Sequence, residues 1–307
     1  MIVLAIGGGG DIVTAAALAE KLGAEVGLLP WERFVVDPVP GPLTSSDFVG
    51  AEGDGAVFVR GPETRARRGE RIFKPQGACA ASVLGRRVYA VSPDRKPSEV
   101  GKALASFGEV VGVDVGGDVL AQGCEPELHS PLADSYSLAV LKRAEEAGAV
   151  AEVAVVGLGA DGELPRRYLM ERAALLMKNG GFRGYYALGP EDVGLLERLT
   201  SACVTEASAM ILRALRGHYG EVPIRGGSRL AYVDAFTPVA LRFSPGAVLE
   251  INDVARIIYE EDLDVLSAAR RLRELGFTTE YDFEEYIAKG LSPEEALKRV
   301  REHRRCG

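Results

Sequence analysis

The sequence predicts an α/β protein with a doubly wound, mainly parallel sheet and a helical extension at its C-terminal end. Short apolar runs rich in β-branched residues alternate with longer helical patterns over most of the chain. Glycine-rich loops follow several of these runs, and the last part of the chain is helical and highly charged. Such alternation is typical of a parallel sheet covered by helices on both faces.

The first elements follow in the order strand, helix, strand. Ile2–Ile6 is an apolar run that predicts a buried strand, Ile12–Leu22 is an alanine- and leucine-rich helical pattern, and Glu25–Leu29 predicts the second strand. Further strands are expected at Ala56–Arg60, Val88–Ser92, Val110–Val115, Glu152–Val156 and Gly184–Leu188. Further helices are expected at Pro97–Phe107, Pro131–Ala147, Leu164–Met177 and Pro190–Leu199. This order of elements is Rossmann-like.

Two segments interrupt the alternation. Trp31–Phe48 is rich in proline, which blocks both ladder and helix hydrogen bonds, so we expect a rigid extended loop there. A second segment combines glycine and proline with the basic residues Arg60, Arg65, Arg67 and Arg68. It predicts a flexible basic loop, which could clamp an anion or simply be solvated.

The C-terminal part of the chain has a different pattern. Leu230–Val233 and Val239–Phe243 predict a hairpin or a pair of edge strands, and amphipathic helices are expected at Asp262–Leu275 and Pro293–Arg304. The chain is long enough for one large core, so residues 1–249 are expected to form an α/β ligand-binding core. Residues 250–307 are expected to form a helical extension packed on that core, as a packing element, a lid or a contact within a homo-oligomer.

The composition narrows the classes of partner. The formal net charge is −8 and the pI is about 5.2, whereas a nucleic-acid partner requires a basic face, so we expect no nucleic-acid binding. No apolar run approaches the roughly 18 residues needed to span a bilayer, so no membrane association is expected. The apolar N-terminal run has no basic residues before it and indicates a first strand rather than a signal peptide.

The cysteine pattern bears on the cellular compartment. Cys79, Cys124, Cys203 and Cys306 form no CxxC pair, so neither a zinc ribbon nor a redox dithiol is indicated. We therefore expect reduced, mostly buried thiols in a cytoplasmic protein.

The loop after the first strand predicts an anion site. Gly8, Gly9, Gly10 and Asp11 lead into a helix, and glycine lets backbone N–H groups approach a ligand at a helix N-terminus, where anions are favoured. It is not a dinucleotide fingerprint, because the third glycine position is Ile12 and no acid ends the second strand, so NAD is not an expected cofactor. The alternative is that Asp11 only caps the helix.

The loop after the fifth strand predicts a metal site. Asp114 and Asp118 bracket Gly116 and Gly117 at the end of a buried strand, where carboxylates are costly unless they bind a cation or are well hydrogen-bonded. Oxygen ligands suit Mg²⁺, so Asp114 and Asp118 are candidate metal ligands, and one of them could instead act as a general base. The alternative is that Asp118 is only a turn residue and Asp114 caps a neighbouring loop.

A third loop and the next helix complete the predicted site. The loop after the sixth strand contributes Gly157, Gly159 and Asp161 as candidate ligand-binding residues. Glu125 and Ser130 precede the helix that starts at Pro131, and Asp134 in its first turn is a third catalytic candidate beside Asp114 and Asp118. Ser130 and Asp134 also suit a helix start without any ligand. Because ligands bind at the carboxyl ends of parallel strands, we expect one site for a small anionic metabolite.

The sequence also resembles a family of mostly archaeal proteins catalogued as domain of unknown function 1152. The resemblance rests on Gly7–Asp11, on Trp31–Arg33 with Asp37–Pro42, on Asp114–Asp118 and on Ser130–Ser135. It implies no activity, cofactor or catalytic residue. From the residues, we expect a hydrolase or transferase acting on a small phosphorylated or nucleotide-like metabolite with Mg²⁺. The alternative is a non-catalytic metabolite-binding or sensor protein that uses the same cleft.

Overall fold

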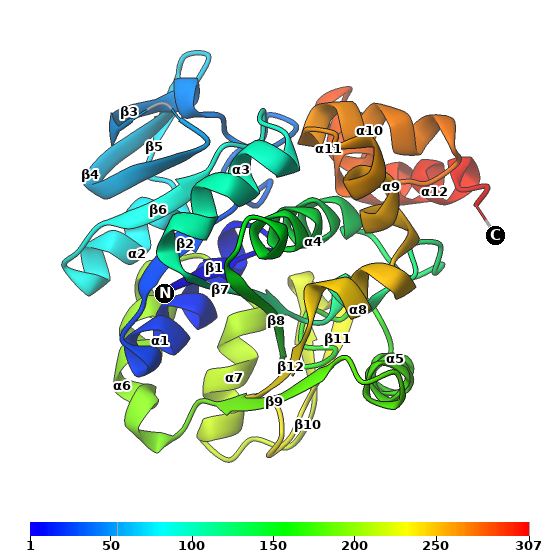
Figure 1. Ribbon diagram of the computed structural model, residues 1–307. Coiled ribbons are helices and arrows are strands. Elements are labelled where there is room, and N and C mark those ends of the chain that lie inside the picture. Colours follow the sequence, from blue (N-terminus) through cyan, green and yellow to red (C-terminus); the bar gives the residue numbers. More distant parts are fainter. Residues whose placement is uncertain (54, 307) are drawn as a thin grey trace.

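A ten-stranded, mostly parallel sheet runs through the computed structural model, which describes residues 1–53 and 55–306 (Figure 1). The path through the sheet is β3-β4-β6-β2-β1-β7-β8-β12-β9, with β5 paired to β4. Its strands are β1 (Ile2–Ala5), β2 (Glu25–Leu28), β3 (Phe48–Glu52), β4 (Val57–Arg68), β5 (Arg71–Phe73), β6 (Val88–Val91), β7 (Glu109–Val115), β8 (Val150–Val156), β9 (Phe182–Ala187) and β12 (Val239–Phe243). A separate two-stranded sheet pairs β10 (Gly220–Ile224) with β11 (Arg229–Val233).

The parallel part of the sheet has a switch in its strand order. Strands β6, β2, β1, β7 and β8 are mutually parallel. The chain first builds outward from β1 through β2 to β6, then returns to the other side of β1 with β7 and β8. The carboxyl ends of β1 and β7 therefore meet at a topological switch point, which is where α/β proteins of this class bind ligands. The expected doubly wound α/β class is confirmed.

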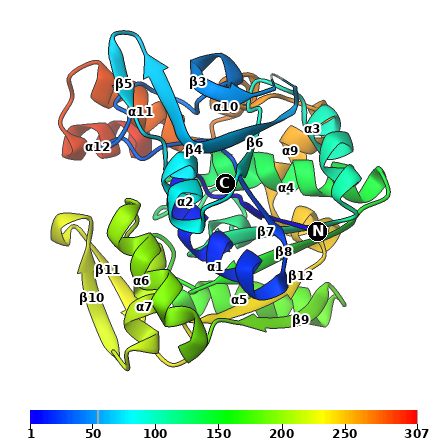
Figure 2. The same ribbon diagram turned by 90° about the vertical axis from the view of Figure 1, so that its left-hand side faces the viewer.

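Helices cover both faces of the sheet, because the side chains of its central strands alternate between two apolar cores. In β1, Ile2 and Leu4 pack with α4 and the C-terminal helices, whereas Val3 and Ala5 pack with α1, α2, α6 and α7. Figures 1 and 2 show these two layers on either side of the strands. The helices are α1 (Ile12–Leu22), α2 (Gln76–Leu84), α3 (Pro97–Leu104), α4 (Pro131–Glu146), α5 (Arg166–Lys178), α6 (Val193–Ala202), α7 (Ala207–Leu215), α8 (Pro245–Ile251), α9 (Asp253–Glu261), α10 (Val265–Glu274), α11 (Glu280–Ala288) and α12 (Pro293–His303).

Two expectations about strands are wrong. Val239–Phe243 forms neither a hairpin with β11 nor an edge strand: it lies inside the main sheet, antiparallel to both β8 and β9. Local patterns could not reveal this pairing, because its partners lie more than fifty residues earlier in the chain. The expected flexible basic loop is mostly strand β4, which pairs with β3, β5 and β6. Arg60 in that strand is fully buried, and its guanidinium lies 4.7 Å from the ring centroid of Phe48.

The expectation of reduced thiols is also wrong. Cys79 in α2 forms a disulfide with Cys203, and Cys124 forms one with Cys306 near the C-terminal end. The partners are 124 and 182 residues apart in sequence. Spacing between neighbouring cysteines therefore carried no sign of either pair, and both arise from the tertiary fold.

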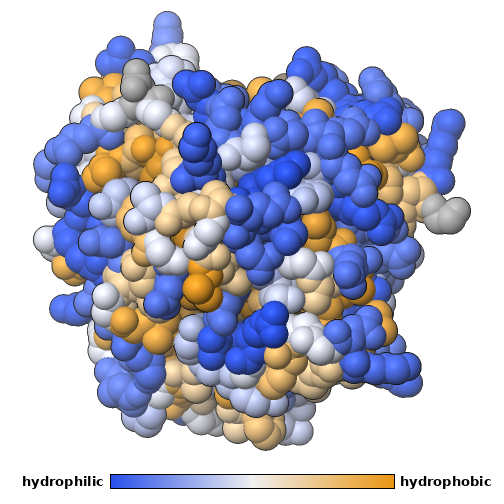
Figure 3. Space-filling view, in the orientation of Figure 1, coloured by the Kyte–Doolittle hydropathy of each residue, from blue (hydrophilic) through white to orange (hydrophobic). Residues whose placement is uncertain are grey.

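The C-terminal helices are continuous with the apolar core. Helix α8 spans the expected boundary at residue 249, and Val254, Ile258 and Leu272 belong to the same buried cluster as Leu4 of β1. Seen from the side of Figure 3, the molecule exposes mainly hydrophilic side chains, with small apolar patches between them. Within residues 1–53 and 55–306, no helix combines the length and the apolar character that crossing a membrane requires.

Candidate functional site

Three loops meet at the carboxyl edge of β1, β7 and β8. They are Gly7–Asp11 after β1, Gly116–Leu120 after β7, which ends in a short 3-10 helix, and Gly157–Glu163 after β8. The N–H of Val115 donates to Oδ2 of Asp11 at 3.3 Å, and the N–H of Gly159 donates to the carbonyl of Gly116 at 2.7 Å. The loops thus lie on one edge of the sheet, as the sequence predicts, and they bond directly to one another.

A first trio of buried carboxylates joins three separate segments. Asp11, Asp114 and Asp134 each place an oxygen within 4.8 Å of the other two, and none of them is more than 7% exposed. Asp114 holds the following turn, because its oxygens accept the N–H groups of Gly117 at 3.3 Å and Val119 at 3.1 Å. Oδ1 of Asp134 is buried and accepts no hydrogen bond.

A second trio lies beside the first and consists of Asp118, Asp161 and Glu163, whose oxygens also lie within 4.8 Å of one another. Oε1 of Glu163 accepts bonds from the Ser130 hydroxyl and from Arg229, both at 2.8 Å. The Ser130 hydroxyl also lies 3.1 Å from Oδ2 of Asp118. Oδ1 of Asp118, like Oδ1 of Asp134, is buried without a partner.

The pKa shifts of the carboxylates differ between the two trios. Burial, and next the charge of Asp114, raises the pKa of Asp11 and of Asp134 well above the usual range, and burial raises the pKa of Asp114 to about 6. Burial, and next the charge of Glu163, raises the pKa of Asp161 to about 7. Burial, the largest single effect, raises the pKa of Glu163, but the charge of Arg229 together with His129 and the hydrogen bonds with Asp118 and Ser130 lowers it further, to about 2.

The six carboxylates lack compensating cations. In the described part of the chain, Arg229 is the one basic side chain that forms an ion pair with any of them. Buried carboxylates are costly unless they are neutralised or coordinate a cation. Buried polar atoms are nearly always bonded, but one buried oxygen of Asp118 and one of Asp134 have no partner among the described residues, so each could coordinate a cation. Oxygen-only donor sets of this kind suit Mg²⁺ or Mn²⁺.

Glycines at this edge allow the carboxylates to approach the backbone. A Cβ atom on Gly7 would lie 2.5 Å from Oδ2 of Asp11, and one on Gly116 would lie 2.5 Å from Cγ of Asp161. These positions therefore exclude any side chain unless an acid moves. The N–H of Gly9 donates to the carbonyl of Trp31 at 2.7 Å, so this amide is engaged within the chain rather than aimed at an external anion.

The remaining predicted residues have diverse surroundings. Glu125 belongs to neither trio: it accepts the N–H groups of Gln122 and Gly123 and the hydroxyl of Tyr168, so it shapes its own loop. Positive φ angles place five predicted glycines in turns around the trios, and these are Gly8 (102°), Gly116 (132°), Gly117 (114°), Gly157 (61°) and Gly159 (78°). Gly10 lies against the start of α7, where an added Cβ would be 3.8 Å from Oγ1 of Thr205.

Two residues of the site were not predicted. Glu163 follows Asp161 by two positions in the same loop, so its place in the loop was a usable signal. Arg229 lies 66 residues beyond Glu163 in β11, and no local pattern connects them. His129 also contacts the site, because its N–H donates to Glu163 at 2.7 Å. Burial lowers the pKa of its imidazole to about 4, so the ring is neutral near pH 7.

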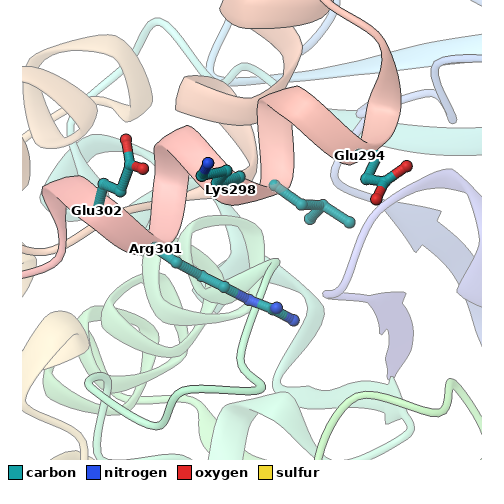
Figure 4. A pocket seen from close by; sticks show the side chains of 5 residues that line it. Glu294, Lys298, Arg301 and Glu302 are labelled. Atoms are coloured by element: carbon teal, nitrogen blue, oxygen red, sulfur yellow. The ribbon is translucent and has the colours of Figure 1, made fainter.

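A separate hollow of about 510 Å³ lies along α12 (Figure 4). Its lining residues are Glu294, Leu297, Lys298, Arg301 and Glu302. They come from one helix, carry mixed charge and include none of the six carboxylates. The chemistry therefore points to the switch point rather than to this hollow.

Comparisons with known proteins place the chain in a family. No curated protein and no solved structure matches it. The model of one protein family, described as a protein of unknown function, covers residues 2–288 and so includes both carboxylate trios. The chain therefore belongs to the family of proteins of unknown function DUF1152.

Proposed function

We propose that this protein is a Mg²⁺- or Mn²⁺-dependent hydrolase or transferase that acts on a small phosphorylated or nucleotide-like metabolite. The observation that carries the proposal is that two trios of buried carboxylates adjoin. They are Asp11, Asp114 and Asp134, and next to them Asp118, Asp161 and Glu163. Among the described basic side chains, only Arg229 forms an ion pair with any of these six. A divalent cation would neutralise carboxylates that otherwise repel one another. It would also let an anionic substrate approach an acidic centre at the topological switch point.

The trios would have different chemical roles. Asp114 is bonded to the backbone through both oxygens, so it is a preorganised ligand for the cation. Asp118 and Asp134 each keep one buried oxygen free, to coordinate the cation or to accept a proton from a water or hydroxyl nucleophile. A bound Mg²⁺ would polarise a phosphoryl oxygen and help generate that nucleophile.

The test compares metal binding in two variants of the full chain. Mg²⁺ and Mn²⁺ should raise the melting temperature of the parent protein by mass action, corresponding to about 2.7 kcal/mol at a hundredfold excess over Kd. Asp118→Asn should reduce this response sharply, because an amide oxygen carries no charge. Asp94→Asn is the matched control, since Asp94 is exposed and lies outside both trios. Isothermal titration calorimetry gives the affinities directly.

Metal-free stability distinguishes a ligand site from a structural one. In EDTA, Asp118→Asn should be at least as stable as the parent protein, because it removes a buried charge that burial and Glu163 disfavour. An aspartate with a purely structural role would instead lose stability on substitution. Absence of any metal response in the parent protein, even with a nucleotide or sugar phosphate present, would exclude the metal-dependent function.

A sensor without turnover is the second candidate, and contacts from the C-terminal region favour it. Glu280 of α11 accepts the N–H groups of Leu132 and Ala133, directly before Asp134. Arg304 donates to the carbonyls of Glu125 and Leu128, close to Ser130. Binding or release of a ligand at the trios would therefore alter the contacts of the C-terminal helices. Product formation from a phosphorylated metabolite supports the enzyme, whereas stabilisation without product supports the sensor.

A further inference from the structure

Three arginines from two segments far apart in the sequence converge next to the carboxylate trios. Arg33 follows β2, Arg225 precedes β11, and Arg229 begins β11. Nη2 of Arg33 lies 2.8 Å and Nε of Arg225 lies 3.5 Å from the same oxygen, Oε2 of Glu206. Arg229 lies 2.8 Å from Glu163 of the second trio. We call Arg33, Arg225 and Arg229 the arginine rim.

Arg33 and Arg225 together carry more positive charge than the one carboxylate that both contact, Glu206. Arg225 shares Glu206 with Arg33, and it lies in the turn between β10 and β11, where Arg229 pairs with Ile224, the neighbour of Arg225. Two carboxylates, Glu206 and Glu163, pair with three guanidinium groups. In addition, Nε of Arg33 is buried and has no hydrogen-bond partner. Such an arrangement is stabilised by an added anion, which guanidinium groups bind through paired hydrogen bonds.

The backbone at Arg225 is held in an unusual conformation. Its φ angle is 54°, a left-handed value that the described residues show at one other non-glycine position, Asp262. Only a small fraction of residues other than glycine adopt this region, because it brings Cβ close to the following carbonyl oxygen. The N–H of Arg225 donates to Oε1 of Glu206 at 3.0 Å, so one carboxylate fixes both the backbone of Arg225 and the side chain of Arg33.

The rim lies at the carboxyl edge of the sheet, beside the first glycine loop. Glu206 immediately precedes α7, and Ser208 in the first turn of that helix donates to the carbonyl of Gly10 at 3.2 Å. Figure 2 shows α7 and the β10–β11 hairpin next to each other at the lower left of the molecule. Arg229 joins the rim to the second trio through Glu163. The positively charged rim and the negatively charged second trio are therefore adjacent.

From this juxtaposition, we infer that the arginine rim is the subsite for a phosphate group of the substrate. Because the rim lies next to the trios, a phosphate bound by the rim would lie beside the proposed cation. The ligand class is a phosphate monoester or a diphosphate, because a tetrahedral dianion can accept bonds from several guanidinium groups at once. This inference rests on the proposed function for the role of the cation, but the binding of phosphate by the rim can be measured independently.

The experiment is calorimetric titration of the full-length protein with pyrophosphate, in the presence of Mg²⁺ and separately in EDTA. The variants are Arg33→Gln and Arg225→Gln, and each is expected to weaken pyrophosphate binding about tenfold or more. Arg225→Lys keeps the charge and should recover part of the affinity. Arg213→Gln is the matched control, because Arg213 is exposed on α7 and has no ion pair among the described side chains. Circular dichroism checks that each variant is folded.

Titration with Mg²⁺ alone separates the two proposals. If Mg²⁺ binds the parent protein and both rim variants equally, the loss of pyrophosphate affinity belongs to the rim and supports the inference. If Mg²⁺ binds, but Arg33→Gln and Arg225→Gln bind pyrophosphate as tightly as Arg213→Gln does, the rim is not a phosphate subsite and the proposed metal site is retained. If Mg²⁺ fails to bind while pyrophosphate affinity still depends on both arginines, the metal-dependent function is excluded and the rim stands. If the parent protein binds no pyrophosphate, either with Mg²⁺ or in EDTA, the rim is not a phosphate subsite.

Discussion

At the residue scale, the candidate site depends on how closely carboxylates approach the backbone. Gly7 directly precedes Gly8, Gly9 and Gly10, which the sequence predicts as part of an anion site. In the structure its missing side chain makes room for acids, because an added Cβ would lie 2.5 Å from Oδ2 of Asp11 and 3.0 Å from Oδ1 of Asp134. Gly7 thus makes room for the carboxylates of the first trio, whereas the positive charge at this edge comes from the arginine rim.

Gly7→Ala is therefore expected to disturb metal binding more than folding. The new methyl group has to displace Asp11 or Asp134, so the first trio loses its geometry, and Mg²⁺ affinity should fall about tenfold or more. The measurement is calorimetric titration with Mg²⁺. Gly194→Ala in α6 is the control, because a Cβ there meets no atom within 4 Å and an alanine suits a helix. Equal Mg²⁺ affinity in the two variants would show that the first trio is not a metal site.

At the scale of elements, two glutamates attach α11 to the core, the half-buried Glu280 and the buried Glu284. Glu280 accepts the N–H groups of Leu132 and Ala133 in the first turn of α4, at 2.9 and 2.8 Å. Glu284 accepts the indole N–H of Trp31 at 3.1 Å and the N–H of Gly41 at 2.8 Å. Burial raises the pKa of Glu280 to about 8 and that of Glu284 to about 7, from an ordinary value of 4.5.

These shifts predict a pH dependence of stability with a definite sign. The folded protein binds these protons more tightly than the unfolded chain, so their contribution to stability is complete below about pH 4.5 and is lost as pH rises through about 7 to 8. Trp31 is the sole tryptophan, so its fluorescence should report the titration of Glu284 with a midpoint near 7. Glu284→Gln should abolish that transition and flatten the stability profile. A parent protein whose Trp31 emission stays constant across this range would contradict the assignment.

The same scale shows what the sequence could and could not predict. Ile12–Leu22 was predicted to the residue, because alanine and leucine favour the helix and Gly23 ends it with a φ of 64°. The strand-end loops were predictable from the parallel order alone. The position of β12 and the burial of Arg60 were not, because both depend on partners far away in sequence. The candidate site divides in the same way: four of its six acids follow strand ends, Asp114 lies in β7 and Asp134 in α4, whereas Arg229 comes from a distant hairpin.

At the scale of the whole molecule, covalent links join distant parts of the chain. The Cys79–Cys203 disulfide connects α2 to the segment that precedes α7. That segment carries Glu206, which pairs with two arginines of the rim. The Cys124–Cys306 disulfide connects the loop after β7 to the residues after α12. Arg304 binds the same loop through the carbonyls of Glu125 and Leu128. Both links therefore restrain segments next to the candidate site.

Removal of either disulfide should lower the stability of the protein. A cross-link that closes a loop of 124 or 182 residues restricts the unfolded chain strongly, and measured contributions of such links are about 2 to 5 kcal/mol. Denaturant unfolding of Cys79→Ser/Cys203→Ser and of Cys124→Ser/Cys306→Ser should each show a loss in this range. The parent protein treated with a reductant should lose the sum of the two, because the links lie in different regions.

Loss of the Cys124–Cys306 link should also have a local effect that loss of the other link does not. Without it, the residues after α12 are held mainly by Arg304, so trypsin should cleave the C-terminal end faster in the Cys124→Ser/Cys306→Ser variant than in the Cys79→Ser/Cys203→Ser variant. Alkylation of the unfolded, unreduced parent protein followed by mass spectrometry gives the number of free thiols, for which we expect none. Four alkylated cysteines in the protein as purified without reductant would contradict the disulfides and restore the expectation of reduced thiols.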